Sequence, residues 1–279
     1  MPKTIKRLVR NFAFTTGFAL TVVLVFIALA APLLSPFDPD VQDTSRRLEP
    51  PSHEHLLGLD DLGRDVLSRI IWGARVSLRV GFSVVLIASI IGVALGAISG
   101  YFGGWVDTGI MRLTDILLAF PGILLAIALV AMLGPSLNNV VLALATIGWV
   151  GYARLVRGQV LKVREMEFVT AAKALGAKSP RVIVRHVLPN VMNPVIVMAT
   201  LGLAGAILAE AALSFLGLGV QPPTPSWGAM LTAGRRYLGL ANHLAIYPGI
   251  AIMLAVMGLN FLGDGLIDAL DPKYRKRME

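Results

Sequence analysis

Few residues of this 279-residue chain are placed where they could carry out a reaction. It has no cysteine, and of its four histidines only His53 and His55 are close enough in sequence to share a metal ion. A phosphate-binding loop needs a Gly-Lys step, and this dipeptide does not occur in the sequence. We therefore expect that the chain is not an enzyme and binds no cofactor or metal of its own.

One acidic residue stands out because of its surroundings. Glu210 lies in the apolar sequence AILAEAALSF. Within a membrane, an ionisable side chain costs about 2.5–3.5 kcal/mol on insertion scales, so Glu210 needs a polar environment. Two explanations remain open: Glu210 lines a polar path for a solute, or it is a hydrogen-bonded anchor between helices.

The basic segment of residues 154–190 contains the pattern of a short amphipathic helix. In the sequence REMEFVTAAKALGAK, an i, i+3 spacing predicts one apolar stripe made of Met166, Val169, Ala172 and Leu175. Such a helix either docks into a partner or lies on the membrane surface.

The small residues of this segment fit the same interpretation. Alanines such as Ala171 keep a helix thin enough to enter a groove, and Gly176 can end or bend it. Pro189 is expected to stop helix propagation before the next apolar stretch. The segment is therefore predicted to present a short helix on a stalk.

The composition shows which elements must position these residues. Hydrophobic residues make up 56% of the chain and charged residues 15%, which suits burial in lipid better than a water-soluble fold. A spanning helix needs about 20 mostly apolar residues. The sequence thus predicts an all-α membrane protein with six transmembrane helices, at residues 13–34, 80–100, 113–133, 138–156, 191–216 and 245–267.

The distribution of charge predicts the orientation. The net charge is +8, but the basic residues cluster beside predicted spans and not along one recognition helix, so nucleic acid is not an expected partner. Lys and Arg are more frequent in the segments that share a side with both termini, which predicts cytoplasmic termini in a bacterial inner membrane. The predicted parts are a cytoplasmic N-terminus (1–12), a first transmembrane helix (13–34), a periplasmic loop (35–79) and a five-helix core (80–279) that contains the cytoplasmic loop 154–190.

Small residues and one proline mark special positions within the predicted spans. A glycine recurs at every fourth residue on one face of the second span. This spacing lets helices approach closely, although glycine is also simply frequent in membrane helices. Pro121, in the third span, predicts a kink that is either a hinge or static. The predicted packing face consists of Gly92, Gly96, Gly100 and Gly104.

The loop 154–190 resembles the "EAA" loop of permeases in binding-protein-dependent importers of the ATP-binding-cassette class. From Glu167 it reads EFVTAAKALGAKSPRVIVRHVLPN, with Thr170 where that pattern has Glu and His186 where it has Ile. The resemblance implies that this helix couples the chain to an ATPase subunit. The residues implied in coupling are Glu167, Thr170, Ala171, Ala172, Leu175, Gly176, Leu188 and Pro189.

Two further stretches, LGLDDLGRDVLSRIIWGARVSLRVG from Leu57 and LSFLGLGVQPPTPSWGAM from Leu213, narrow the resemblance. They are similar to the C-type permease subunit of the dipeptide, oligopeptide and nickel importers. The resemblance implies a type I importer permease fold with a coupling helix. It also implies a second homologous permease subunit, two cytoplasmic ATP-binding subunits that hold ATP and Mg, an extracellular solute-binding protein and membrane lipid as partners.

Other classes of function remain as alternatives. A self-sufficient carrier driven by an ion gradient usually places charged or discontinuous helices around a midplane site. Glu210 is the one residue that supports this alternative. A self-sufficient carrier would give the amphipathic helix of the loop 154–190 no function. A membrane enzyme would need catalytic groups that the sequence lacks. The solute itself stays open between dipeptides, oligopeptides, nickel, glutathione-like compounds and oligosaccharides.

Overall fold

The structure, a computed structural model, describes residues 11–270. The regular elements among these residues are helices joined by loops, apart from one isolated β-bridge between Leu59 and Asp65. The α-helices are α2 (Phe12–Leu29), α3 (Ala31–Leu34), α4 (Val66–Phe102), α5 (Gly104–Leu118), α6 (Gly122–Leu133), α7 (Leu137–Val163), α8 (Glu167–Ala174), α9 (Ser179–Val182), α10 (Leu188–Phe215), α11 (Trp227–Gly234) and α12 (His243–Leu270). Shorter turns of other helical types are η1 (Thr44–Arg46), η2 (Ile183–Val187) and η3 (Arg235–Tyr237).

Five of the described helical segments are long and apolar enough to cross a membrane: α2, α4, α7, the run Ser179–Phe215 and α12. The pair α5 and α6 makes a sixth candidate if it is counted as one span, although it is bent by 84°. The predicted all-α membrane fold is therefore confirmed, with five continuous candidates and one broken one.

The third predicted span is not a continuous helix. α5 ends at Leu118 and α6 begins at Gly122, so the prediction of one helix over 113–133 is wrong. Pro121 has no N–H to continue a helical ladder, and it disfavours the helical conformation for Phe120 before it. The result is a full break, where the sequence predicted only a kink.

The second span begins earlier than predicted, because α4 starts at Val66 and not near residue 80. The side chain of Asp65 accepts a hydrogen bond from the backbone N–H of Ser68 at 2.7 Å, which caps the helix. Arginines within residues 66–79 interrupt the apolar sequence, so the sequence pattern predicts a loop there. One of them, Arg69, is nevertheless buried (5% exposed) and donates a hydrogen bond to the carbonyl of Pro39 at 2.8 Å. The predicted loop 35–79 therefore ends at Asp65.

Pro189 does not stop the helix, contrary to the prediction. Residues Ser179–Phe215 form one helical run, with the π-helical turn η2 directly before α10. The wider turn makes room for a proline ring that lacks an N–H. The side-chain amide of Asn190 donates to the carbonyl of His186 at 2.7 Å, so a carbonyl of the irregular turn keeps a partner.

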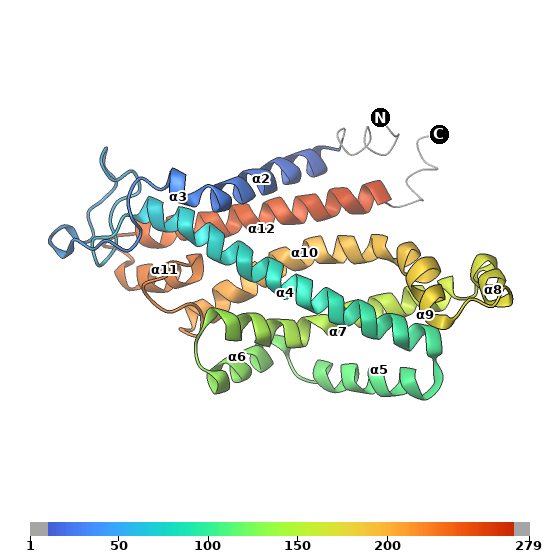
Figure 1. Cartoon of the computed structure of the whole chain (residues 1–279). Coiled ribbons are helices and arrows are strands. Elements are labelled where there is room, and N and C mark those ends of the chain that lie inside the picture. The colour runs from blue at the N-terminus through green and yellow to red at the C-terminus, as the bar shows by residue number, and fades with distance from the viewer. Residues whose placement is uncertain (1–10, 271–279) are drawn as a thin grey trace.

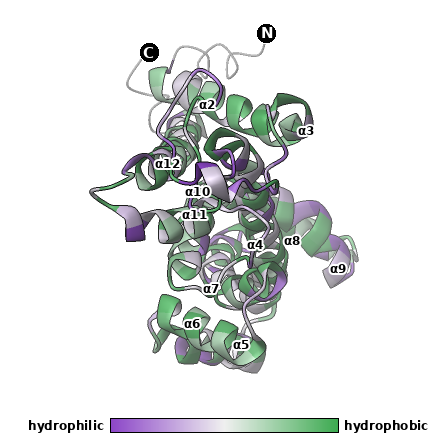
Figure 2. Ribbon diagram, turned by 90° about the vertical axis from the view of Figure 1, so that its left-hand side faces the viewer, coloured by the Kyte–Doolittle hydropathy of each residue, from purple (hydrophilic) through white to green (hydrophobic). Residues whose placement is uncertain are grey.

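The long helices run side by side along one axis (Figure 1). α4 packs along α7 and α10, and α2 packs along α12. One end of the bundle carries α8, and the other carries α11 together with the loop 35–65; we call these the α8 end and the α11 end (Figure 1). Viewed along the bundle, α5 and α6 lie at the edge opposite α2 and α12 (Figure 2).

Candidate functional site

The short helix α8 stands out from the bundle at the α8 end (Figure 1). Its last turn closes with Gly176 at φ +80°, a conformation that suits glycine. The N–H of Gly176 donates to the carbonyl of Lys173 at 2.9 Å, and that of Ala177 to Ala172 at 3.1 Å. These two bonds form a Schellman motif, so Gly176 ends the helix as its sequence predicted.

One face of α8 packs against its own chain. Val169 is fully buried, and Ala172 is 9% exposed. Val169 belongs to a cluster that also contains Val163 at the end of α7, Val182 in α9 and Val187 in η2. This cluster holds α8 on both segments that connect it to the bundle.

The rest of α8 faces outward. Leu175 is 89% exposed, Met166 46% and Phe168 41%. The predicted apolar stripe is therefore split: Val169 and Ala172 face the chain, whereas Met166 and Leu175 face away. The helix turns an apolar surface outward, and Glu167, Thr170 and Ala171 are also exposed.

Two side chains tie α8 to the end of α4. The ammonium of Lys173 lies 5.1 Å from the ring centroid of Tyr101, within the range of a cation–π contact. Arg164, directly after α7, donates to the carbonyl of Gly100 at 2.8 Å. On the other side, Leu188 is partly buried against the same valine cluster, and Pro189 is exposed. Through these contacts and the valine cluster, α8 is connected to the ends of α4, α7 and α10.

The predicted glycine face is present for three of its four members. A Cβ atom at Gly92, Gly96 or Gly100 would lie within 3 Å of α7 atoms, for example 2.4 Å from the Ala153 carbonyl oxygen at Gly96. Gly104 does not belong to this face. It opens α5 at φ +54° with nothing around its Cβ position, because the chain turns at the preceding residue.

Glu210 is fully buried where α10 crosses α4. Its carboxylate accepts hydrogen bonds from Ser214 at 2.7 Å and from Ser77 of α4 at 3.4 Å. Of the two explanations offered by the sequence, this geometry matches the anchor between helices. The cavity described below is lined by other residues.

The structure brings together two ion pairs that sequence reasoning missed. Arg157 in α7 binds Asp107 in α5 with Nε–Oδ1 at 2.5 Å, and Arg154 binds Asp115 of the same two helices at 2.5 Å. The first pair is the more buried; in the second, both side chains are about half exposed. The two acids are eight residues apart in α5 and the two arginines three apart in α7, so their spacing along the sequence did not suggest these pairs.

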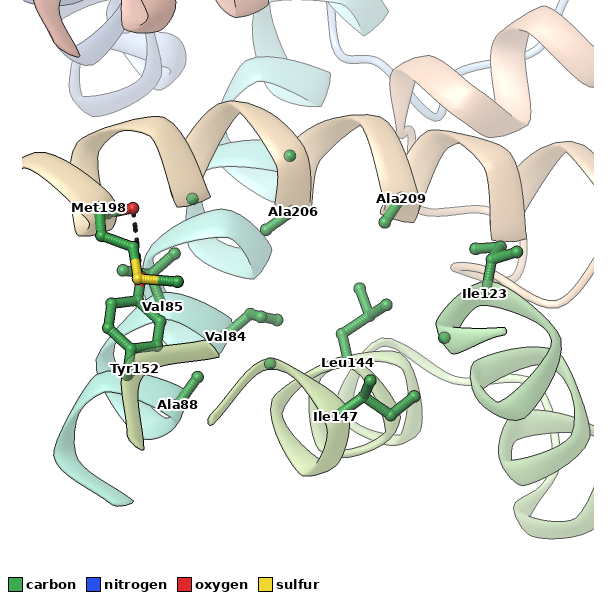
Figure 3. Close-up of a pocket in the computed structure, with 14 residues that line it drawn as sticks. Val84, Val85, Ala88, Ile123, Leu144, Ile147, Tyr152, Met198, Ala206 and Ala209 are labelled. Carbon is green, nitrogen blue, oxygen red and sulfur yellow. Dashed lines mark hydrogen bonds between the residues drawn. The ribbon is translucent and has the colours of Figure 1, made fainter. Parts of the chain in front are cut away.

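A cavity of about 320 Å³ lies between α4, α6, α7 and α10 (Figure 3). Its walls are apolar side chains such as Val84, Leu144 and Ile147, together with bare helix backbone at glycines. The Tyr152 hydroxyl, at one side, lies 3.5 Å from the Met198 carbonyl. Sequence analysis did not predict this cavity, because its walls come from four separate helices.

The α11 end is held by a network of charged residues. Asp65 accepts from His55 at 2.9 Å, and Asp60 binds Arg64 at 2.7 Å. Hydrogen bonds from Arg46 hold the pKa of Glu49 below its usual value. His55 is thus committed to the cap of α4, and no group of three or more metal-ligating side chains occurs within residues 11–270.

Comparison with protein families identifies two matching regions. Residues 92–276 match the family described as binding-protein-dependent transport system inner membrane component. Residues 3–51 match the N-terminal transmembrane domain of oligopeptide transport permease C.

Individual relatives match over nearly the whole chain. The dipeptide transport system permease protein DppC of Alkalihalophilus pseudofirmus is 50% identical over 97% of this chain and 89% of its own length. The glutathione transport system permease protein GsiD of Pectobacterium atrosepticum is 44% identical over 97% and 90%. The di/tripeptide permease DppC of Pseudomonas aeruginosa is 46% identical over 98% and 94%.

Among solved structures, an inward-facing form of the MetNI methionine ABC transporter resembles this chain with a TM-score of 0.59. The match covers 74% of this chain and 97% of that chain at 17% identity, so it bears on the fold alone. The predicted importer-permease fold is confirmed by this likeness and by the family match. The chain belongs to the family of binding-protein-dependent transport system inner membrane components.

Proposed function

We propose that this chain is one of the two membrane subunits of an ATP-binding-cassette importer for short peptides. The observation that carries the proposal is the 50% identity, over 97% of the chain, to a permease named for dipeptide transport. The relatives named for di/tripeptide and glutathione transport widen the expected solutes to peptides of two or three residues. The family match favours this function over a carrier driven by an ion gradient.

In this proposal α8 is the contact to a cytoplasmic ATP-binding subunit, which holds ATP and Mg. The outward surface around Leu175 and Phe168 supports this role, because it leaves apolar side chains without a partner in this chain. Val169 and Ala172 act from the inner side, since they fix α8 to the bundle. Closure of two ATP-binding subunits would then move α8, and with it α4, α7 and α10.

The α11 end is proposed to lie outside the membrane, with both termini and α8 in the cytoplasm. The excess of Lys and Arg in residues 154–190 supports this orientation. A solute-binding protein would dock on the loop 35–65 and on the segment around α11. The charged network of Asp60, Arg64 and Asp65 gives this surface a fixed shape.

Affinity capture after gentle solubilisation tests the assembly, and uptake tests the solute. A second membrane subunit and ATP-binding subunits should copurify, and the reconstituted complex should take up a labelled dipeptide only with ATP and the binding protein. If the chain purifies alone and moves the dipeptide in liposomes under an ion gradient, it is a self-sufficient carrier and the proposal is wrong.

A further inference from the structure

The outer surface of α5 carries charged residues deep within the part of the bundle that crosses the membrane. α4 is uncharged from Val80 to Phe102, which is about 34 Å of helix and close to the roughly 30 Å thickness of a hydrocarbon core. The end of this run at Phe102 therefore marks one boundary of the core. α5 begins at Gly104 and runs back along the bundle (Figure 1), so Asp115 lies about 16 Å inside that boundary.

This charge belongs to an exposed stripe along α5. The members of the stripe recur at intervals of three or four residues, which places them on one face of the helix. All of them are exposed: Thr108, Arg112, Asp115 and Ala119. We call these residues the α5 stripe. Arg154 of α7 lies beside it, because its guanidinium pairs with the carboxylate of Asp115 at 2.5 Å.

The charged groups at the α5 stripe are not satisfied by this chain. Within residues 11–270, Arg112 makes no hydrogen bond or ion pair. One N–H of Arg154 is bonded to Asp115, and the other N–H groups of its guanidinium have no partner in the same part of the chain. Charged side chains within membrane spans face protein or a water-filled cavity, because lipid offers them no hydrogen bonds. Lipid is therefore not the neighbour of this stripe.

The opposite edge of the bundle has the surface expected against lipid. α2 has no charged residue between Phe12 and Leu29, and its outward side chains, such as Val23 and Phe26, are apolar and more than half exposed. Viewed along the bundle, α2 and α5 lie at opposite edges (Figure 2). Lipid can cover the α2 edge, whereas the α5 edge needs another neighbour.

The break between α5 and α6 points the same way and is independent of the charges. Phe120 is 57% exposed, Pro121 is exposed, and no side chain caps the first turn of α6. The N–H groups of a first turn have no partner within their own helix. Non-helical backbone at membrane depth is tolerated only where it is buried in protein or lines a water-filled cavity.

Water accounts for both observations more simply than a tight protein contact does. A protein partner would have to match Arg112, the free N–H groups of Arg154 and the open backbone near Pro121 one by one. The centres of protein interfaces are depleted in charged residues, and an unpaired charge is costly to bury. Water satisfies all these groups without a specific partner. The chain also belongs to a family of transport-system components, which need a route for water-soluble solutes through lipid.

We propose that the α5 stripe and Arg154 line a water-filled path between this chain and the second membrane subunit. Glu210, which the sequence offered as a path residue, is the buried anchor described above, so the path runs along α5 instead. The exposed charges of both signs suit a path for hydrated, charged solutes. This inference rests on the proposed importer function.

Spin labels at single cysteines test the path, because the chain has no cysteine of its own. Ala119→Cys puts a nitroxide on the α5 stripe without removing a charge. Val23→Cys is the matched control, since Val23 is 54% exposed and lies about 17 Å from the start of α2, also deep in the core. In the reconstituted importer, electron paramagnetic resonance compares how strongly two agents relax each label: chromium oxalate, which stays in water, and oxygen, which concentrates in lipid.

The expected result is a clear difference between the two positions. We expect the ratio of relaxation by chromium oxalate to relaxation by oxygen to be roughly tenfold higher at Ala119→Cys than at Val23→Cys, because ions are excluded from the hydrocarbon core. The difference should appear in at least one of two states, with ATP or without it.

The other outcomes separate this inference from the proposed function. A label at Ala119→Cys that oxygen relaxes as it relaxes the control would place the α5 stripe against lipid. A label that neither agent reaches in either state would place it in a protein contact. Either result would overturn the water-filled path and leave peptide transport standing, since uptake of a labelled dipeptide by liposomes with the unmodified complex measures that separately. If chromium oxalate reaches the stripe but no dipeptide is taken up, the path stands and the peptide assignment is wrong.

Discussion

The carboxylate of Asp107 in α5 accepts two hydrogen bonds from the guanidinium of Arg157 in α7, at 2.5 and 2.6 Å. The hydroxyl of Ser99 in α4 donates to the same carboxylate at 2.5 Å. α5 buries Thr114 alone among its residues, so apolar packing contributes little to its attachment. A bidentate arginine–carboxylate pair fixes both the distance between the two side chains and their orientation. This contact therefore determines how α5 lies against α7.

Removing this charge should loosen α5. Asp107→Asn leaves Arg157 without its charged partner, and we expect the free energy of unfolding to fall by about 1.5–3 kcal/mol. Thermal unfolding of the detergent-solubilised complex measures it. The matched control is Asp115→Asn, which breaks a pair that is about half exposed and should cost less than about 1 kcal/mol. Equal losses in both variants would show that α5 is not held mainly by Asp107.

Two substitutions of Glu210 distinguish a structural role of its side chain from a role of its charge. Glu210→Gln keeps the size of the side chain and an oxygen that can accept from Ser214, so stability should stay within about 1 kcal/mol and uptake should persist. Glu210→Ala leaves Ser77 and Ser214 unpaired beside a void, and we expect a loss of about 2–4 kcal/mol. Unfolding and peptide uptake are measured for both. Abolished uptake in a stable Glu210→Gln variant would contradict the anchor role.

The contact between α4 and α7 should tolerate no added atom. At Gly96 a Cβ would lie 2.4 Å from the Ala153 carbonyl oxygen, which is backbone and cannot move aside cheaply. We expect Gly96→Ala to cost about 1–3 kcal/mol of unfolding free energy. Gly109→Ala, on the exposed side of α5, should be neutral or slightly stabilising. A neutral Gly96→Ala would mean that the two helices can separate without loss.

Features set by local sequence were predictable. The long apolar runs predicted the spans because lipid leaves no alternative to a helix over such lengths. The end of α8 followed from Gly176, since few other residues adopt its backbone conformation readily. Three of the four glycines that the spacing predicted lie on the packing face.

Features that depend on contacts between distant segments could not be predicted from the sequence. The start of α4 at Val66 depends on burial of Arg69 under the carbonyl of Pro39, thirty residues earlier. The helix continues through Pro189 because of a π-helical turn, and no residue type in the sequence predicts that turn. The cavity and the pairing of Asp107 with Arg157 need the mutual placement of several helices, which periodicity within one helix does not contain.

The two sides of α8 predict opposite effects of the same substitution. Leu175 is 89% exposed and touches nothing that the bundle needs, so Leu175→Arg should leave the unfolding temperature unchanged. If the outward surface docks on an ATP-binding subunit, the variant should lose copurifying ATP-binding subunits while keeping its membrane partner, because a charge enters an apolar contact. Ala172→Arg is the matched comparison. Ala172 is 9% exposed, and a buried arginine there should displace α8 and lower the unfolding temperature itself. Retention of the ATP-binding subunits by Leu175→Arg would show that the outward surface of α8 is not where they bind.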